Sequence, residues 1–144
     1  MRISDILRSK SGNGAAVVSI APDATVTELV TLLAEHRVGA LIVTVGTDVV
    51  GIVSERDVVR RLHEQGADVL QAPVSELMTS PVITCAPSDY VDAIAETMTQ
   101  RRFRHLPVVE DGQLVGVVSI GDVVKNRIQE LEKDRSQLEQ YVTG

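Results

Sequence analysis

The sequence has very few aromatic residues and almost no cysteine. Aromatic side chains make up 2% of its 144 residues, tryptophan is absent, and Cys85 is the one cysteine. One cysteine cannot form an internal disulfide, and nothing in the sequence suggests an oxidising compartment, so we expect a cytoplasmic protein. The core must consist of aliphatic side chains, and aromatic stacking platforms for single-stranded nucleic acid are largely excluded.

The sequence also lacks long apolar runs and an excess of positive charge. No apolar stretch approaches the roughly 20 residues of a membrane span, and the N-terminus lacks the apolar core of a signal peptide. Lys and Arg number 14 against 20 Asp and Glu, which gives a net charge of −6. An acidic surface repels a phosphate polymer, which argues against nucleic acid as a partner. A small nucleotide in a locally basic pocket remains compatible with this charge.

What the sequence does contain is one unit, present twice. A shift of 65 residues aligns residues 17–59 with residues 82–124 without a gap, and 14 of the 43 positions are identical. The segments that precede the two copies, residues 3–7 and 74–78, also match. The chain is therefore two copies of one supersecondary unit.

Each copy predicts three strands, because short apolar runs end at Ala-Pro or at turn residues. Asp111-Gly112 is a hairpin turn signal in the second copy. The expected strands are residues 17–20, 40–45 and 49–53 in the first copy and 82–85, 106–109 and 114–118 in the second.

Each copy also predicts a helix with one buried face after its first strand. Apolar residues recur there at i, i+3, i+4 and i+7. Thr25 and Glu28 have the spacing of a capping box, whereas Tyr90 gives the second copy a weaker start signal. The residues of the buried face are Val26, Leu29, Val30 and Leu33 in the first copy and Val91, Ile94, Ala95 and Met98 in the second.

The predicted unit is β-α-β-β-α with a short lead-in helix, and residues 60–73 form a helix end and a linker. A three-stranded sheet with helices on one side leaves its other face apolar and in need of cover. We therefore expect an α+β fold in which the two copies pack as a pseudo-two-fold sandwich. The expected domains are residues 1–70, with the lead-in and the first repeat, and residues 71–144, with the second repeat and a C-terminal helix.

The strings Gly51–Asp57 and Gly116–Asp122 share the pattern Gly-x-x-Ser-x-x-Asp, and each lies where a strand becomes a helix. A helix start offers free backbone N–H groups and a positive dipole end, which suit a phosphate. The Asp, one turn into the helix, can accept hydrogen bonds from a ribose diol. The alternative interpretation is plain helix capping by Ser-x-x-Asp, which gene duplication would also copy.

In combination these features resemble a tandem pair of cystathionine-β-synthase (CBS) domains, a Bateman module, over about residues 3–130. The sequence is similar above all to stand-alone bacterial proteins that consist of this pair. The residues that carry the resemblance are the Ala-Pro start of each copy, Gly39-Ala40-Leu41-Ile42-Val43, Arg104-His105-Leu106-Pro107-Val108, the two Gly-x-x-Ser-x-x-Asp strings and Val74-Ser75-Glu76-Leu77-Met78-Thr79.

The resemblance implies a sensor that binds AMP, ADP, ATP, NAD(H) or S-adenosylmethionine in clefts between the two repeats. By position, Asp57 and Asp122 would hold ribose hydroxyls, and Ser54 and Ser119 would contact phosphate or ribose. The strand ends would contact the adenine through Val18 to Ile20, Gly39, Ala40, Val82 to Thr84, His105, Leu106 and Pro107.

The two copies differ in where they place positive charge. The first copy has Arg56 where the second has Gly121, and the second has Arg104-His105 where the first has Gly39-Ala40. We expect both clefts to suit nucleotides, with different affinities, and Arg104 and His105 to be phosphate candidates. Arg101 and Arg102 are interpreted as a solvated helix end.

Lys10 lies in a glycine-bearing stretch, residues 9–14, that we expect to be flexible. It is either a solvated lysine or a cation that folds over a phosphate.

No residue constellation predicts an enzyme or a catalytic cofactor. Cys85 and His105 on neighbouring strands would be two metal ligands, which are too few without further support. Cys85 also lacks a base and an orienting group, so we expect a small buried residue. P-loop and dinucleotide-binding glycine motifs are absent from the sequence.

The C-terminal helix continues past the repeat, with apolar residues at coiled-coil spacing and Arg135 interrupting the seam. It either lies on its own module or forms a dimer contact. The family pattern, in which two pairs associate into a flat disc through their helices, favours a homodimer. The apolar residues are Val124, Ile128, Leu131, Leu138 and Val142.

The sequence therefore predicts a regulatory adenine-nucleotide sensor that acts in trans on a partner protein, without nucleic acid or membrane. The alternative is a structural homodimeric scaffold with vestigial ligand clefts. An enzyme acting on a nucleotide is the third possibility, and no residue pattern supports it.

Overall fold

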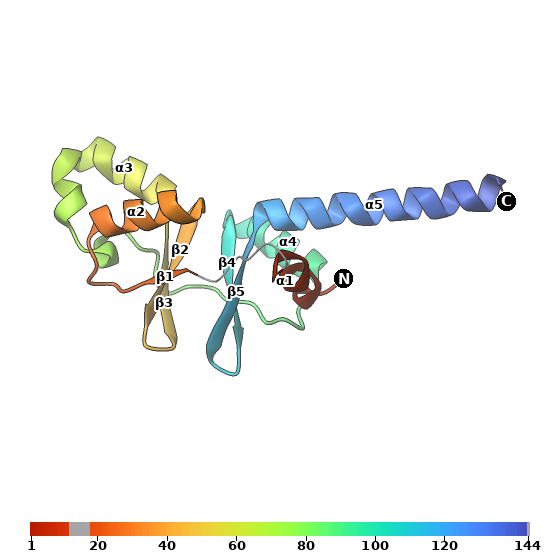
Figure 1. Ribbon diagram of the computed structural model, residues 1–144, viewed down its shortest axis with the longest axis horizontal. Helices are drawn as coiled ribbons and strands as arrows, with labels where there is room; N and C mark the ends of the chain where they lie inside the picture. The colour runs from red at the N-terminus through yellow and green to blue at the C-terminus, as the bar shows by residue number, and fades with distance from the viewer. Residues whose placement is uncertain (12–17, 144) are drawn as a thin grey trace. The chain divides into compact units, whose positions relative to one another are not determined.

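The computed structural model describes residues 1–11 and 18–143 (Figure 1). These residues fall into two compact units. Unit 1 comprises residues 1–11, 85–108 and 116–143, and unit 2 comprises residues 18–84 and 109–115. The domain boundary that we expect between residues 70 and 71 separates the two sequence copies, and it stays a prediction.

The first copy forms a three-stranded sheet in the order β1-β2-β3, flanked by helices. β1 runs parallel to β2, with Ser19 opposite Ile42, and β2 runs antiparallel to β3. This confirms the predicted order of elements, although Val17 lies outside the described residues. The elements are β1 (Ser19–Ile20), α2 (Val26–His36), β2 (Ala40–Val45), β3 (Asp48–Ser54), α3 (Glu55–Gln65) and the 3-10 helices η1 (Gly66–Gln71) and η2 (Val74–Glu76).

The start and the buried face of α2 follow from its sequence. The Thr25 hydroxyl oxygen accepts the Glu28 N–H at 3.2 Å, which caps the helix as predicted. Leu29 and Leu33 are buried, but Val30 is 39% exposed, so its predicted burial is wrong. At 3.6 residues per turn Val30 lies at the edge of the stripe that the other three apolar residues define.

The predicted linker after α3 is structured. η1 places Val69 in the core of unit 2, and the Thr27 hydroxyl of α2 donates to the Leu70 carbonyl at 2.8 Å. The chain therefore packs on α2 where we expected a helix end and a connection.

The second copy repeats the helices and the hairpin. Asp111 and Gly112 have φ of 51° and 77°, so both central residues of the predicted tight turn are left-handed. α4 has no side-chain cap at Tyr90, as its weaker start signal indicated. The elements are α4 (Val91–Arg101), β4 (His105–Glu110), β5 (Gln113–Ser119) and α5 (Ile120–Thr143).

The predicted strand over residues 82–85 is wrong. Cys85 makes one isolated parallel bridge to Val108, and β4 pairs with β5 in a two-stranded sheet. In the first copy, pairing Ser19 with Ile42 requires the N–H of Ile42. Its equivalent in the second copy is Pro107, which has no N–H, so the parallel ladder cannot extend to residue 84.

Each lead-in segment pairs with the other copy. In unit 1, Ile3 N–H donates to the Asp89 carbonyl at 2.9 Å, and Val91 N–H donates to Met1 at 3.0 Å. In unit 2, the equivalent hydrogen bonds are present. The Val74 N–H donates to the Ala24 carbonyl at 2.8 Å, and the Val26 N–H donates to the Ala72 carbonyl at 3.0 Å. The first lead-in is the nine-residue helix α1 (Ile3–Ser11), whereas the second is only the three-residue η2.

The repeated glycines receive these lead-in segments. A Cβ at Gly51 would lie 2.6 Å from Met78 Sδ and 3.2 Å from Met78 Cβ. A Cβ at Gly116 would lie 2.5 Å from Leu7 Cδ2. Glycine at these positions lets the lead-in side chain lie directly against the backbone of the strand.

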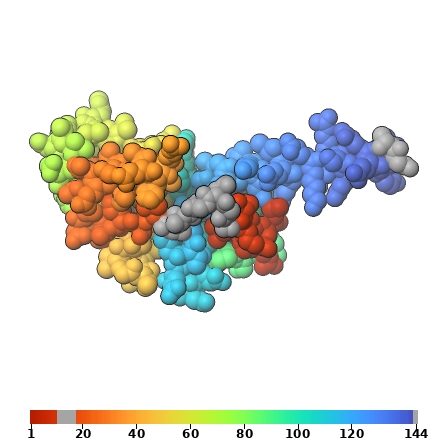
Figure 2. Space-filling model, in the orientation of Figure 1, coloured from red at the N-terminus to blue at the C-terminus, as the bar shows by residue number. Residues whose placement is uncertain are grey.

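α5 runs past α1 and α4 of its own unit (Figure 1). Val123 and Asn126 are buried, but the predicted coiled-coil seam is exposed along its length, from 49% at Val124 to 81% at Val142. The space-filling view shows the last turns of α5 with no other segment of unit 1 on the visible face (Figure 2).

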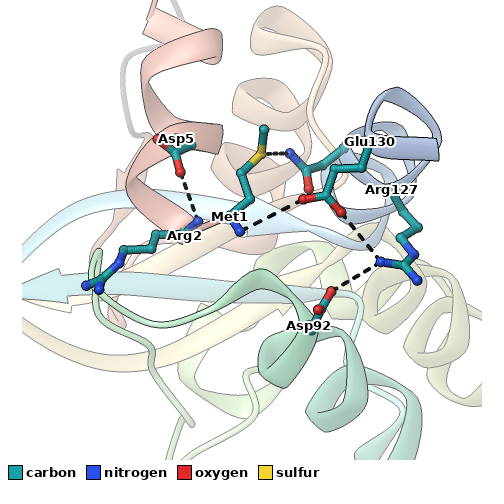
Figure 3. A network of polar contacts seen from close by, with 7 residues as sticks. Met1, Arg2, Asp5, Asp92, Arg127 and Glu130 are labelled. Carbon is teal, nitrogen blue, oxygen red and sulfur yellow. Dashed lines mark hydrogen bonds and ion pairs between the residues drawn. The ribbon is translucent and has the colours of Figure 1, made fainter. Parts of the chain in front are cut away.

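Polar contacts hold the N-terminus against α5 (Figure 3). The Met1 amino group lies 3.9 Å from Glu130 Oε1, and Arg127 lies 3.5 Å from Glu130 Oε2 and 3.7 Å from Asp92 Oδ1. The Asn126 amide donates to Met1 Sδ. Most of these charges are exposed, so they position α1 on α5 more than they stabilise it.

Within residues 1–11 and 18–143, no helix is long and apolar enough to cross a membrane.

Candidate functional site

In the first copy, the start of β2 and the start of α3 meet at one end of the sheet. Ala40 pairs with Ser54, and the Glu55 N–H donates to the Gly39 carbonyl at 2.9 Å. Because Ser19 lies opposite Ile42 in a parallel pairing, Val18 also lies at this end of the sheet. The topology therefore brings together the strand ends and the Ser-x-x-Asp turn that the sequence singled out.

Ser54 and Asp57 form a capping box at the start of α3. The Ser54 N–H and hydroxyl donate to Asp57 Oδ2 at 2.8 and 3.0 Å, and the Asp57 N–H donates to Ser54 Oγ at 3.4 Å. The second carboxylate oxygen of Asp57 lies 3.5 Å from Arg60 Nη2. The capping interpretation is therefore correct, and it fixes the orientation of this carboxylate.

The second copy reproduces this geometry at the start of α5. The Ile120 N–H donates to the Arg104 carbonyl at 2.8 Å. The Ser119 N–H donates to Asp122 Oδ2 at 2.9 Å, and the Asp122 N–H donates to Ser119 Oγ at 3.1 Å. Both copies thus hold a carboxylate in the same way at the same junction.

Lys10 distinguishes the two copies. Its ammonium donates to Asp122 Oδ2 and to the Val117 carbonyl, both at 2.9 Å. Burial alone would raise the pKa of Asp122, but the Ser119 N–H and the Lys10 ammonium lower it below its usual value. The expected flexible stretch is wrong at Lys10, which lies in α1 because the helix continues to Ser11. Residues 12–14 lie outside the described residues.

In the first copy, a pair of backbone hydrogen bonds takes the place of the contact between Lys10 and the Val117 carbonyl. The Ile52 N–H donates to the Thr79 carbonyl at 3.1 Å, and the Thr79 N–H donates back at 2.8 Å. Ile52 is the equivalent of Val117, and the lead-in position equivalent to Lys10 holds Pro81. The first copy therefore has no ammonium at this place.

The remaining candidate residues divide by exposure. Ile20, Ala40, Leu106 and Pro107 are buried, so these side chains belong to the core. Val18, Gly39, Val82 and His105 are half-buried, and Arg56, Thr84 and Arg104 are exposed. The buried residues can contact a ligand only through backbone groups or the edges of their side chains.

A pocket between α1 and α5 in unit 1 includes residues that the sequence reasoning missed. Lys10 and Asp122 line it together with Lys125, Asn126 and Gln129. The available signal was the position of Lys125, three residues after Asp122 on the same helical face.

Cys85 is a small buried residue, as predicted. Burial and the nearby Asp89 carboxylate raise the pKa of its thiol to about 12. The sulfur is therefore a neutral thiol at physiological pH. Among the residues that the structure describes, His, Cys, Asp and Glu form no group of three or more that could hold a metal ion.

Comparison with known proteins matches two stretches of the chain, residues 3–64 and 74–128, to the CBS domain family model. The chain is 35% identical to the mitochondrial CBS domain-containing protein CBSX3 of Arabidopsis thaliana, over 99% of this chain and 72% of that protein. It is 43% identical to the CBS-domain protein ATU1752 of Agrobacterium tumefaciens, with a TM-score of 0.81 over 88% of this chain and 99% of the other.

A third similar structure is the CBS domain protein PAE2072 of Pyrobaculum aerophilum complexed with AMP. It is 35% identical, with a TM-score of 0.74 over 85% of this chain and 89% of the other. The duplicated unit, the Ser–Asp junction in each copy and these matches agree, and the chain belongs to the CBS domain family as a tandem CBS pair.

Proposed function

We propose that this chain binds an adenine nucleotide and regulates a partner protein in trans. The observation that carries the proposal is the pair of matched junctions, in which Ser54 and Asp57, like Ser119 and Asp122, fix a carboxylate at a strand-to-helix turn. The AMP complex of the Pyrobaculum aerophilum relative supports the ligand class.

The candidate residues would take distinct parts of the nucleotide. Asp57 and Asp122 would accept hydrogen bonds from ribose hydroxyls through the carboxylate oxygen that the capping Ser N–H leaves available. Backbone groups near Gly39 and His105 would contact the adenine, since the neighbouring strand residues are largely buried. AMP, ATP and NAD(H) share this adenosine moiety.

Regulation would follow from differential affinity. A ligand changes the state of a partner only if it binds one conformation of the sensor more tightly than another. CBS domain proteins are generally regulatory, and the described residues contain no constellation that we can assign to catalysis. The single cysteine supports placing this activity in the cytoplasm.

A structural homodimeric scaffold is the second candidate function. The exposed apolar seam of α5, with Leu131 at 54% and Leu138 at 66% exposure, favours self-association. The scaffold would keep the α5 contact and leave the Ser–Asp junctions as helix caps without a ligand.

A thermal-shift titration with AMP, ADP, ATP, NAD⁺, NADH and S-adenosylmethionine separates the two functions. A ligand at 100 times its dissociation constant adds about 2.7 kcal/mol to the free energy of unfolding, which raises the melting temperature. We expect a saturable shift with at least one adenine ligand. No shift at millimolar concentration would favour the scaffold.

Asp57→Ala and Asp122→Ala test the assignment of the ribose contacts. Each should weaken nucleotide binding at its own copy, as measured by calorimetry, while circular dichroism shows a folded chain. Unchanged affinity in both single variants and in the double variant would overturn the assignment.

A further inference from the structure

The pocket between α1 and α5 carries an excess of positive charge on an acidic chain. Lys10 and Lys125 face one carboxylate there, Asp122, and the other polar lining residues are the neutral Ser9, Asn126 and Gln129. The whole chain has a net charge of −6. A local excess of one positive charge in a concave site attracts an anion.

The two lysines have different tasks. Lys10 is engaged, because its ammonium donates to Asp122 and to the Val117 carbonyl. Lys125 is exposed and makes no hydrogen bond or ion pair with any residue that the structure describes. Since Lys10 already neutralises the Asp122 carboxylate, the Lys125 ammonium is available to bind an anionic ligand.

The first copy lacks this arrangement. The residue equivalent to Lys125 is Arg60, which lies 3.5 Å from Asp57, and the residue equivalent to Gln129 is Glu64. The residue equivalent to Asn126 is Arg61, whose guanidinium donates to the Glu76 carbonyl at 2.7 Å, so two cations there stand against two carboxylates. The corresponding face of α3 therefore carries no excess of positive charge, and both of its cations already have a partner, whereas Lys125 has none among the described residues.

We propose that the α1–α5 pocket binds the phosphate of an adenine nucleotide at the second copy, with Lys125 as the phosphate ligand and Lys10 as a positioning residue for Asp122. The inference rests on the proposed function and deepens it. It makes the second copy selective for phosphorylated adenine nucleotides over S-adenosylmethionine, because the sulfonium of that ligand is repelled by the pocket. It also predicts tighter binding of AMP than of adenosine.

Calorimetry with AMP and adenosine on Lys125→Gln tests the phosphate contact. Loss of one charge-assisted hydrogen bond should weaken AMP binding by about tenfold or more and leave adenosine binding unchanged. Lys133→Gln is the matched control, since Lys133 is an exposed lysine of α5 outside the pocket, and it should bind both ligands like the unmodified chain. An unchanged ratio of AMP to adenosine affinity in Lys125→Gln would overturn the proposal.

Lys10→Met tests the positioning role. The variant should weaken the binding of AMP and of adenosine by a similar factor, because Lys10 acts through the ribose contact of Asp122. Carboxyl NMR should show that the pKa of Asp122 is raised. Loss of AMP affinity alone would assign Lys10 to the phosphate instead, and an unchanged Asp122 pKa would remove the positioning role.

A titration with inorganic phosphate and pyrophosphate, followed by amide NMR, distinguishes failure of this inference from failure of the proposed function. Saturable shifts at Lys125, Asn126 and Gln129 without nucleotide binding would show that the pocket binds anions, and they would overturn the proposed nucleotide function. Nucleotide binding that is insensitive to Lys125→Gln would retain the function and overturn the pocket. If neither anions nor nucleotides bind, both are overturned.

Discussion

The two copies share one pattern of sequence and differ in how each completes it. Both hold a Ser–Asp junction in the same capping geometry. The first copy completes its sheet with β1 and pairs Ile52 with backbone, whereas the second loses its first strand and uses a lysine side chain against Val117. The local motif is thus the same in both copies, and Pro107 and Lys10 are two positions at which the copies differ in structure.

The largest expected effect comes from exchanging Ile42 and Pro107, the equivalent residues of β2 and β4 that lie beside the first strand of each copy. Ile42→Pro should destabilise unit 2 by about 3 kcal/mol or more, because it removes a ladder donor and a fully buried side chain. The reverse change, Pro107→Ile, supplies the missing N–H and should lengthen the pairing at residues 83–85. Denaturant unfolding measures the first and amide hydrogen exchange the second. Unchanged exchange at these residues in Pro107→Ile would show that Pro107 is not what ends the strand.

The next effect compares the two glycines. Gly51→Ala and Gly116→Ala should each destabilise the chain by about 1–3 kcal/mol through overpacking. Gly51→Ala should cost more, because its Cβ approaches Met78 Cβ as well as Sδ, whereas at Gly116 the second-nearest Leu7 atom is 3.4 Å away and the leucine can rotate. Thermal unfolding measures both. A larger loss at Gly116 would mean that the two lead-in contacts do not differ in this way.

The smallest expected effect comes from replacing Lys10, the partner of Asp122 in the second copy. The folded-state pKa of Asp122 is lowered, so its ionised form stabilises the fold above the unfolded-state pKa of about 3.9. This contribution is lost as the pH falls through the lower folded-state pKa. Lys10→Met should therefore lower stability at pH 7 by about 0.5–1 kcal/mol and make its loss begin at a higher pH in acid unfolding. An acid transition that coincides with that of the unmodified chain would show that Lys10 does not hold Asp122 ionised.

Most of the elements could be predicted from local signals. The hairpin at Asp111-Gly112, the cap at Thr25 and the buried Leu29 and Leu33 depend on turn chemistry, capping and periodicity over a few residues. The strand over residues 82–85 was wrong because its own sequence is suitable, and the obstacle, Pro107, lies on its partner. A local pattern does not report whether a neighbouring strand can donate.

The candidate site was predictable in part. Ser54, Asp57, Ser119 and Asp122 stand out because the repeat marks them twice. Lys125 was missed because its position three residues after Asp122 does not show that its side chain lines a pocket. Its environment depends on α1, which lies more than a hundred residues earlier in the chain.

By itself, the sequence determined the duplicated unit, the helices and the hairpin of each copy and the two capped Asp carboxylates, because these depend on residues close together in the chain. Only the tertiary structure decided that each lead-in segment pairs with the other copy, and that Lys10 reaches Asp122 across 112 positions. The physical reason is that such contacts depend on which helix faces pack together. Packing is set by the summed burial of many side chains, so no local motif encodes it.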